Sequence, residues 1–547
     1  MPARRVMAVL GGLVLALAVF LAVRALHASL VPGEPFDVDW INGFALAVVA
    51  AALVLCWVEQ ADAARALRPA RPAASCLATA IAALSVLAYE GLGNVQFPYH
   101  RWEQFTYYIG AKYFPELGYT RLYACTAVAE AERVGPRWVA SRPIRDLLTD
   151  ELVPGSTALE HPEACKGHFS PARWAAFVED VNWFRTDTVR PYWIRMQGDH
   201  GFNPPPPWVV SGRALASLAP ASARTQTRLA LIDPVLLVAA FALVGWAFGA
   251  HVFWVALVVW GCQFPAKGAW TAGAFLRQDW FLAFVASVCL ARRGRWLGAG
   301  AALATSAALR IFPALLLAVP LLVAARRWWQ TGSLAHASRR FAAGLLLGGA
   351  FWFATSTALF GPGAWREFAE HMARHRAAPL ANHVGLRAIL SQTIDGRLAV
   401  TQDDRQVDPY REWKARRKAA FTARRPLYVA AVCAIVLVSL AASLRIRRLW
   451  CALVASSALV MALLDLASYY YAFFVGLALL AARSASLERL ALGAVAVDRL
   501  INVPALVTGN PDVQYALHSI VFLTWAVLAV VIVTWGRGAR PARMPSP

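Results

Sequence analysis

Charged side chains are scarce in this sequence of 547 residues: they make up only 16% of it, whereas hydrophobic residues make up 59%. Soluble domains carry about 25% charged and about 45–50% apolar residues, so this composition excludes an ordinary soluble protein. Alternating polar and apolar segments of about ten residues are also missing, which excludes a membrane β-barrel. The apolar residues instead form runs of about 20 residues, long enough to cross the hydrocarbon core as helices. We therefore predict an all-α polytopic membrane protein.

Acidic residues are few as well, 32 against 53 Lys and Arg, which gives a net charge of +21. No basic segment has the aromatic or base-reading context of a nucleic-acid surface, so we predict no nucleic-acid partner. The basic residues lie in short loops between apolar runs, a pattern typical of cytoplasmic loops. These stretches are RRVM near the N-terminus, RALRPARP (65–72), RRGR (292–295), RRWW (326–329), RRF (339–341), RIRR (445–448) and the tail RGARPAR (537–543).

Placing these loops on one face predicts a bundle of about 12–14 transmembrane or re-entrant helices, with the first run retained as a signal anchor. The expected spans lie near 6–26, 41–58, 74–93, 228–248, 252–265, 278–291, 341–360, 427–444, 449–466, 469–483, 488–507 and 515–535. A further apolar stretch is broken at RIFP (310–313), where Pro313 removes a helix hydrogen bond. Because both ends of that stretch are basic, it should form two short helices or a re-entrant pair.

The same arrangement divides the chain into five regions, of which two are long polar segments outside the cytoplasm. The regions are an N-terminal three-span segment (1–93), a large extracytoplasmic loop (94–226), a central membrane core with re-entrant helices (227–360), a second extracytoplasmic loop (361–426), and C-terminal spans with a cytoplasmic tail (427–547). Both loops should carry amphipathic helices. In the first, SPARWAAFVEDVNWF predicts a helix with Ser170 as N-cap and Pro171 in its first turn, which lies on the membrane or caps the loop.

Cysteine is rare, and of the eight in the chain only Cys125 and Cys165 lie in the large loop. In an oxidising compartment these two can pair, and free thiols are the alternative. HPEACKGH also offers His161, Cys165 and His168 as metal ligands, but one cluster of three candidates is a weak zinc signal. The sequence thus indicates no metal site and no required cofactor, although a divalent metal is compatible with it.

Ionisable residues at a membrane face cost free energy and usually mark function. On the outer face they are Glu103, Asp199, His200, Lys267, Arg277, Asp279, His371, His375 and Asp465, with Arg310 deeper in the membrane. This mixture, with Tyr and Trp nearby, suits general-base catalysis on a sugar or lipid hydroxyl beside a phosphate. A transporter would more often carry polar residues in broken helices at mid-membrane depth and show an internal repeat, and none is visible here.

Five motifs follow one another along the chain in the order that they have in one known family of membrane proteins. EQFTYYIGAKYFPELGYTRLY (103–123) is similar to the family's acidic residue followed by an aromatic helix and a Gly-x-x-x-Leu-Tyr ending. GFNPPPPWVV (201–210) is similar to its aromatic-Pro-Pro motif. The segment 277–317 resembles the long signature that opens with Gln and closes with a basic-x-x-Pro sequence. FAEHMARHRAAPLANHVGLRAIL (368–390) and DLASYYYAFFV (465–475) resemble its later segments. In this order the five motifs resemble glycosyltransferase family 87 of the GT-C superfamily, the mycobacterial-type mannosyltransferases, and this resemblance implies a GT-C-like bundle.

The resemblance implies an inverting glycosyltransferase in a bacterial inner membrane, with its active site on the periplasmic face. It would move a mannose-like hexose or a pentose from a polyprenyl-phosphate donor to a glycolipid or glycan acceptor, with membrane lipids around it and no metal in the site. Glu103 would be the general base. The expected substrate-binding residues are Arg101, Tyr107, Tyr108, Asp199, His200, Lys267, Arg277, Gln278, Arg374, His375, Asn382 and Tyr470.

Several alternatives remain open at this stage. The chain has two extra spans before the acidic motif and a Glu where Asp is common, so Asp37 and Asp39 in GEPFDVDW are rival bases. Glu103 could instead form an ion pair with Arg101 or Lys112 that only fixes the loop. Arg310 could reach the cytoplasmic headgroups. The alternative functions are a lipid or polyprenol-phosphate transporter, and a non-catalytic subunit of an envelope-glycan assembly complex. Under the enzyme hypothesis, a sugar-sized hollow should be lined by Tyr107, Tyr108 and Tyr113.

Overall fold

The computed structural model describes residues 3–34, 36–60, 66, 70–91, 98–502 and 510–536. Within them the chain is predominantly helical, and eight helices are long and apolar enough to cross a membrane. The protein is therefore a multi-pass membrane protein of α class, as its composition predicts. Half of the basic stretch 65–72 and the whole tail stretch 537–543 lie outside the described residues.

The long apolar helices occupy eight of the expected spans or stretches. They are Val6–Leu30 within α1 (Ala3–Leu30), α2 (Val38–Gln60), α3 (Arg71–Tyr89), Ala223–Phe248 made by α14 (Ala223–Ala230) and α15 (Ile232–Phe248), Phe312–Thr331 made by η4 (Phe312–Leu317) and α20 (Ala318–Thr331), α21 (His336–Phe360), α26 (Arg425–Ser443) and α31 (Pro511–Trp535). Shorter elements occupy the others. They are α16 (Ala250–Cys262), α18 (Asp279–Arg292), α19 (Trp296–Leu309), α27 (Leu449–Ala455), α28 (Ser457–Leu463), η5 (Ser468–Phe474), α29 (Val475–Ala478), η6 (Leu479–Ala482) and α30 (Ala485–Leu500). The short helix α17 (Gly268–Thr271) lies between two of the expected spans.

The stretch broken at RIFP forms two helices, α19 and η4–α20, which meet at Arg310. The backbone of Arg310 is extended and ends α19, and Pro313 lies in the first turn of η4, where its missing N–H is not needed. This confirms the expected break. It also brings Arg310 to the end of the bundle opposite the RRGR and RRWW loops.

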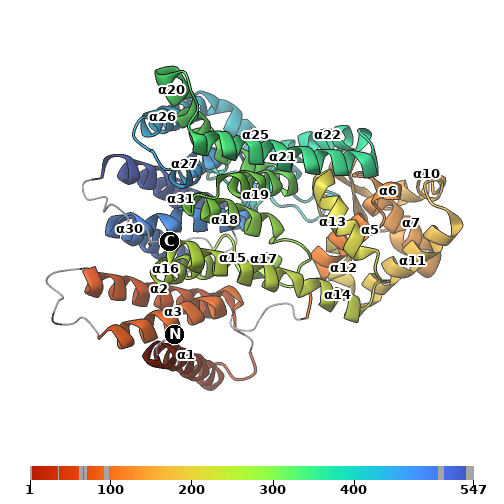
Figure 1. The fold of residues 1–547 in the computed structure, drawn as a ribbon. Coiled ribbons are helices and arrows are strands. Elements are labelled where there is room, and N and C mark those ends of the chain that lie inside the picture. Colours follow the sequence, from red (N-terminus) through yellow and green to blue (C-terminus); the bar gives the residue numbers. More distant parts are fainter. Residues whose placement is uncertain are drawn as a thin grey trace.

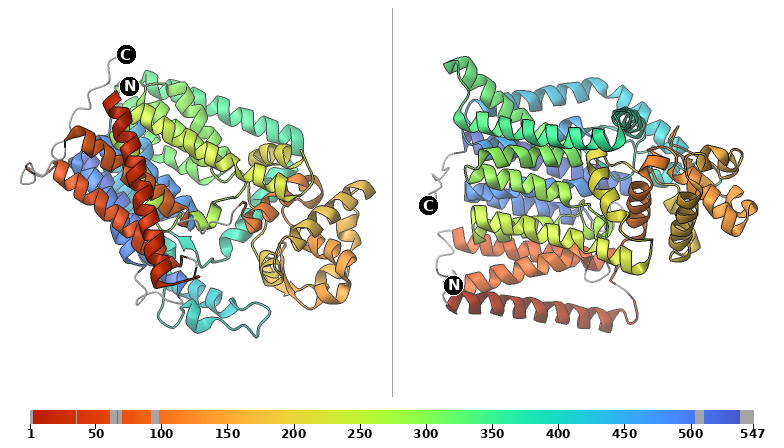
Figure 2. Two further views of the ribbon diagram at one scale, coloured as in Figure 1. Left: turned by 90° about the horizontal axis from the view of Figure 1, so that it is seen from below. Right: turned by 45° about the vertical axis from the view of Figure 1, so that its right-hand side comes forward.

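The basic loops that the structure describes gather at one end of the bundle (Figure 2), where both termini of the described chain also lie. The guanidinium of Arg292 packs over the rings of Phe248 and Trp450, and that of Arg445 lies over Trp535, so the ends of several helices meet there. Residues 101–222 project from the opposite end. The charge pattern of the sequence therefore correctly separates the two ends of the molecule.

The first polar segment is a compact helical unit (Figure 1). Its elements are α4 (Arg101–Gln104), the π-helical turn η3 (Phe105–Ile109), α5 (Gly110–Lys112), α6 (Phe114–Leu117), α7 (Leu122–Val134), α8 (Pro136–Ala140), β1 (Pro143–Asp146), β2 (Glu151–Pro154), α9 (Ser156–Leu159), α10 (Glu163–Lys166), α11 (Pro171–Thr186), α12 (Arg190–Met196) and α13 (Pro206–Ala216). Strands β1 and β2 pair antiparallel, with Ile144 opposite Val153.

Helix α11 is the helix predicted from SPARWAAFVEDVNWF. The Ser170 hydroxyl accepts a hydrogen bond from the backbone N–H of Arg173 at 3.3 Å, which confirms the N-cap. The buried rings of Phe177 and Phe184 pack 5.1 Å from the Tyr113 ring and 5.6 Å from the Phe105 ring. Of the two expected positions, the helix therefore caps the core of the loop.

Cys125 on α7 and Cys165 on α10 form a disulfide, which confirms the pairing. Cys165 is therefore not a thiolate ligand, and the zinc alternative that used it with His161 and His168 loses that ligand.

The second polar segment docks on both the first segment and the membrane bundle. It contains α22 (Gly363–Ala377), β3 (His383–Val384), α23 (Leu386–Leu390), α24 (Leu398–Thr401) and α25 (Arg411–Ala423). Strand β3 pairs antiparallel with β4 (Leu466–Ala467), so the two later motifs of the sequence lie side by side. The Trp413 indole donates to the Asp512 carboxylate at the start of α31 at 3.0 Å.

Candidate functional site

The aromatic segment 99–119 begins where the first polar segment leaves the bundle. The ring of His100 caps α4 by accepting a hydrogen bond from the backbone N–H of Glu103 at 3.3 Å. The next turn is π-helical, a local widening that is often found at functional sites. Consecutive side chains on a helical turn point in different directions, so Tyr107 and Tyr108 enter different environments.

Glu103 and Arg277 form a buried ion pair at this end of the bundle. The Arg277 Nε lies 2.8 Å from the Glu103 Oε2, and 2% of the Arg277 side chain and 15% of the Glu103 side chain are exposed. The guanidinium also donates to the Tyr107 hydroxyl and stacks 4.4 Å from the Tyr107 ring and 4.7 Å from the Tyr469 ring. The backbone N–H of Arg277 donates to the Asp233 carboxylate at 2.9 Å, which fixes its position. We call Glu103, Tyr107, Arg277 and Tyr469 the Arg277 cluster.

The charges around Glu103 act on its pKa in opposite directions. Burial raises the pKa of the Glu103 carboxyl, the positive charges of Arg277 and Arg310 lower it, and Asp199 raises it. Burial is the largest effect, so this carboxylate is a stronger base than an exposed one.

Arg310 is a second buried cation near Glu103. Its guanidinium lies 5.6 Å from the Trp208 ring, and only 5% of the residue is exposed. The guanidinium therefore faces the polar segment, and the alternative that it reaches the cytoplasmic headgroups is wrong. The break at RIFP turns the chain at the polar end of the bundle and leaves this residue there.

Tyr108 and Tyr113 are buried in the core of the polar segment and line no hollow, so that prediction is wrong. The Tyr108 hydroxyl donates to the backbone oxygen of Ala219 at 2.6 Å, and the Tyr113 hydroxyl donates to the Asp180 carboxylate at 2.8 Å. Lys112 lies between them and pairs with Asp180 at 2.7 Å. Lys112 is therefore not the partner of Glu103.

Arg101 does not pair with Glu103 either. Its Nε donates to the Asp187 carboxylate at 2.9 Å, and its guanidinium stacks 5.5 Å from the Tyr99 ring. This pair anchors the start of the aromatic segment. Of the two suggested ion-pair partners of Glu103, the structure shows neither, and the actual partner is Arg277.

Two further predicted substrate-binding residues have structural contacts in the loop that carries Arg277. The Gln278 amide donates to the Thr271 hydroxyl at 3.3 Å, and its backbone N–H donates to Asp233 at 3.2 Å. The Lys267 ammonium lies 3.9 Å from the Phe264 ring. Gln278 is uncharged, and Lys267 is not among the charged groups that act most strongly on the pKa of Glu103.

The later motifs bring their predicted residues to different places. Tyr470 packs 5.1 Å from the Phe312 ring, beside Tyr469 of the Arg277 cluster. The backbone oxygen of Asn382 accepts from the Ser468 N–H at 3.0 Å, which continues the β3–β4 ribbon. Arg374 lies half-buried on α22, and its Nε has no hydrogen-bond partner among the described residues.

A cavity of about 770 Å³ lies between the two polar segments. Trp102, Asp199 and His200 line it from the first segment, and Trp413 and Lys414 line it from the second. The Trp102 indole donates to the Asp199 carboxylate at 2.9 Å. No member of the Arg277 cluster lines this cavity, but Asp199 of its wall is one of the charges that act on Glu103, so the two sites are close to each other.

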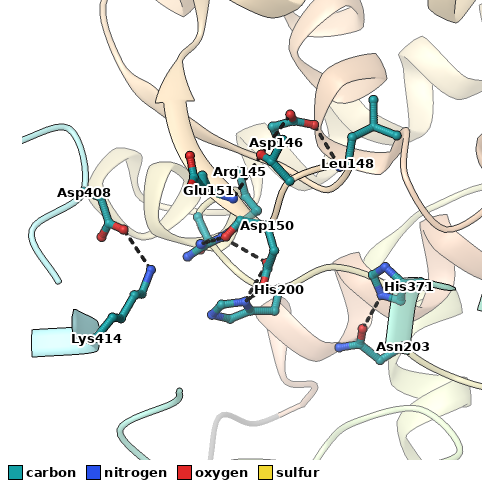
Figure 3. Close-up of polar contacts among 12 residues, drawn as sticks. Arg145, Asp146, Leu148, Asp150, Glu151, His200, Asn203, His371, Asp408 and Lys414 are labelled. Carbon is teal, nitrogen blue, oxygen red and sulfur yellow. Dashed lines mark hydrogen bonds and ion pairs between the residues drawn. The ribbon is translucent and has the colours of Figure 1, made fainter. Parts of the chain in front are cut away.

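Histidines from both polar segments lie in this region: Figure 3 shows His200 of the first segment, which lines the cavity, beside Asp150, and His371 of the second segment beside Asn203. The His200 Nδ1 lies 2.8 Å from an oxygen of Asp150, and the His371 Nε2 lies 2.6 Å from the Asn203 amide oxygen. The rings of His200 and His375 are 5.5 Å apart. Burial lowers the pKa of His371 to about 3, so this ring is neutral at physiological pH. Sequence reasoning selected the three histidines but missed Asp150, because nothing in TDELV distinguishes it from a turn residue.

No protein-family model matches this chain, and no curated protein is significantly similar to it. The resemblance to glycosyltransferase family 87 therefore stays a prediction.

Proposed function

We propose that this protein is a membrane glycosyltransferase that moves a sugar from a polyprenyl-phosphate donor to a hydroxyl group of a glycolipid or glycan. The observation that supports it is the buried Glu103–Arg277 pair, which combines a carboxylate of raised pKa with a fixed cation, close to Asp199 in the wall of a cavity. Buried ionisable groups with perturbed pKa values beside a cavity are typical of catalytic sites.

In this proposal Glu103 accepts the proton of the acceptor hydroxyl. The hydroxyl oxygen forms a bond to the anomeric carbon, the bond from that carbon to the phosphate oxygen breaks, and its electron pair leaves with the polyprenyl phosphate. Attack opposite the leaving group inverts the anomeric configuration. A general base of this kind contributes a factor of about 10²–10⁴ to the rate.

Arg277 and Arg310 supply the positive charge for the phosphate. Both guanidinium groups are buried, and the Arg310 Nη2 has no hydrogen-bond partner among the described residues. The Arg277 Nε faces Glu103 at a short distance but makes no directed hydrogen bond to it. A phosphate oxygen can therefore replace Glu103 as the partner of Arg277, which releases the carboxylate for the acceptor.

We also propose that the end with the basic loops faces the cytoplasm of a bacterial inner membrane, because short Arg-rich loops stay on that side. The Arg277 cluster and the cavity would then open to the periplasm. Single cysteines placed in segment 361–426 should react with an impermeant reagent on intact cells, whereas a cysteine in the 292–295 loop should not. The reverse labelling pattern would overturn this orientation.

The activity is tested by incubating the purified protein with a panel of polyprenyl-phosphate sugars and a membrane lipid extract. One donor should be consumed, and Glu103→Gln should lower transfer by about 10²–10⁴ while donor binding persists, since a base acts mainly on the transition state. Asp199→Asn is the matched control, because Asp199 is the other carboxylate near Glu103. If Asp199→Asn alone abolishes transfer, Glu103 is not the base. If the wild type consumes no donor, the proposed function is wrong.

A further inference from the structure

Asp150, His200 and His375 each bring one ligand atom to within 4.8 Å of the others. We propose that these three residues, which we call the histidine site, bind a divalent transition-metal ion of the Zn²⁺ class. The site is separate from the Arg277 cluster, and the proposal does not depend on the proposed glycosyl transfer.

The fold positions Asp150 by an unusual backbone conformation. Asp150 closes the turn between β1 and β2 with φ of 61°, in the left-handed region that few residues other than glycine adopt. Such a conformation is retained where the surrounding structure determines it, and it is common at functional sites. Here the Arg145 guanidinium donates to the backbone oxygens of Asp150 at 2.7 Å and Gly198 at 2.9 Å, which ties the turn to the loop that carries His200.

The carboxylate of Asp150 faces the imidazole of His200 with both oxygens. These oxygens lie 2.8 Å and 2.9 Å from the His200 Nδ1. The Arg145 Nε lies 3.8 Å from the nearer oxygen, but its N–H groups are directed to backbone oxygens, so the carboxylate keeps lone pairs for another ligand.

His375 supplies an observation that points independently to a ligand. Its Nδ1 is buried and has no hydrogen-bond partner among the residues the structure describes. A buried polar nitrogen without a partner costs free energy, and a metal ion at the ring would remove part of that cost. The ring lies across from His200 at an interplanar angle of 68°, so the two imidazoles can converge on one ion from different directions.

The ligand types select the metal. Two imidazoles and one carboxylate are the protein ligands of many zinc sites that keep an open coordination position. Mn²⁺, Fe²⁺ and Co²⁺ accept the same set, whereas Mg²⁺ and Ca²⁺ prefer oxygen ligands alone. Because His200 lines the cavity, the ion would lie at the cavity wall with its open position available to an oxygen of a bound molecule.

The ion would also join the two polar segments. Asp150 and His200 belong to the first segment, and His375 lies on α22 in the second. The three side chains therefore link the two walls of the cavity, and removal of the metal should loosen the second segment without disturbing the membrane helices.

The test uses the full-length protein without a histidine tag, stripped with a chelator and titrated with ZnCl₂ by calorimetry. We expect about one zinc ion per chain, and weaker affinity by roughly 100-fold or more in His375→Gln and in Asp150→Asn, since even outer partners of metal ligands contribute about 10–100-fold. His168→Gln is the matched control, because this exposed histidine of the first segment should not bind the ion. MgCl₂ should not compete.

A second measurement separates loss of the site from loss of the fold. Zinc should raise the melting temperature of the wild type and of His168→Gln by several degrees and leave His375→Gln and Asp150→Asn unchanged, while all four melt alike in chelator. In chelator, protease should cut segment 361–426 of the wild type faster than with zinc. Absence of saturable zinc binding, or equal zinc affinity in the wild type and both ligand variants, would overturn the proposal.

Discussion

Residues of the aromatic segment 99–119 take part in two buried ion pairs, Lys112–Asp180 and Glu103–Arg277, which differ in how completely they are hydrogen-bonded. In the Lys112–Asp180 pair every strong donor and acceptor has a partner: the ammonium contacts Asp180 at 2.7 Å, the Tyr108 hydroxyl at 2.8 Å and the Ala219 oxygen at 3.1 Å. The Asp180 carboxylate also accepts from the Tyr113 hydroxyl and from the Ala221 N–H. A buried network that is satisfied in this way makes a region rigid.

The Glu103–Arg277 pair is incomplete by comparison. The Glu103 Oε2 and the Arg277 Nε are buried and close but make no directed hydrogen bond, and a second cation, Arg310, lies nearby with an unpartnered Nη2. The site therefore has spare hydrogen-bonding capacity for an anion and a hydroxyl. The difference indicates that the first pair holds the fold together and the second is available for chemistry.

The largest effect is expected for substitution of Asp180, which tests whether the Lys112–Asp180 pair stabilises the fold without taking part in transfer. Asp180→Asn leaves the Lys112 ammonium buried without a counter-charge, so the free energy of unfolding should fall by about 3–5 kcal/mol. Denaturation of the purified protein measures this loss, and the molecules that stay folded should transfer sugar at the wild-type rate.

Glu179→Gln is the control for Asp180→Asn. Glu179 is largely exposed and pairs with Arg133 at the surface, so its loss should change stability by no more than about 0.5 kcal/mol. If Asp180→Asn folds as stably as the wild type but has lost transfer, the Lys112–Asp180 pair is not merely structural and the comparison fails.

The disulfide, like the Lys112–Asp180 pair, should stabilise the first polar segment. Cys125 and Cys165 are 40 residues apart. In the chain-entropy account, a disulfide that closes a loop of this length lowers the entropy of the unfolded chain and so raises the free energy of unfolding by about 4 kcal/mol. In the double variant Cys125→Ser, Cys165→Ser, protease should therefore cut residues 94–226 much faster than in the wild type, as seen by mass spectrometry of the fragments. Cys56→Ser, a buried cysteine of the bundle, is the control. Equal cleavage of wild type and double variant would show that the disulfide adds no stability.

The membrane bundle was largely predictable from the sequence because bilayer thickness sets the length of each apolar run. The helix ends were less predictable: α21 begins at His336, five residues before the expected span, because a helix can continue through polar residues beyond the hydrocarbon. The break at Arg310 followed from Pro313, but the position of Arg310 near Glu103 depends on contacts with distant parts of the chain.

The polar segments were less predictable because their contacts join residues far apart in the sequence. Periodicity alone could not tell that Tyr113 faces Asp180, 67 residues further along the chain, while Tyr107 faces Arg277. The partner of Glu103 was missed for the same reason. Asp150 carries no local signal, since its role depends on the turn that brings it to His200.

A smaller effect concerns the pH dependence of transfer. Glu103 acts as a base only when ionised, and burial raises its pKa, so the rate should fall on acidification at a higher pH than for an exposed carboxylate, whose pKa is about 4.3. The charge of Arg277 lowers that pKa, so Arg277→Met should move the acidic limb of the rate profile to still higher pH. Arg277→Lys keeps the charge and should move it less. Rate–pH profiles of the three proteins measure this.

The contribution of Glu103 to the free energy of unfolding should depend on pH in the opposite direction from that of an ordinary ion-paired carboxylate. Because folded Glu103 holds its proton more tightly than the unfolded chain does, its contribution to stability falls as pH rises from about 4.3 to the raised folded pKa. Glu103→Gln should remove this dependence. An acidic limb at the position of an exposed carboxylate, unchanged by Arg277→Met, would show that Glu103 does not control the rate.

The smallest expected effect belongs to the rival carboxylates in the loop before α2. The Asp37 carboxylate accepts a hydrogen bond from the Trp40 N–H at 2.9 Å and so caps α2, and Asp39 is exposed in the first turn. Asn caps a helix as well as Asp does, so Asp37→Asn should leave both stability and transfer unchanged. Asp39→Asn loses only an exposed charge near the start of the helix, which contributes a few tenths of a kcal/mol. Transfer assays and thermal unfolding of both variants, beside Glu103→Gln, check this directly. If either variant transfers sugar 100-fold more slowly than the wild type while still folding, the catalytic base lies in this loop, and the incomplete Glu103–Arg277 pair has another role.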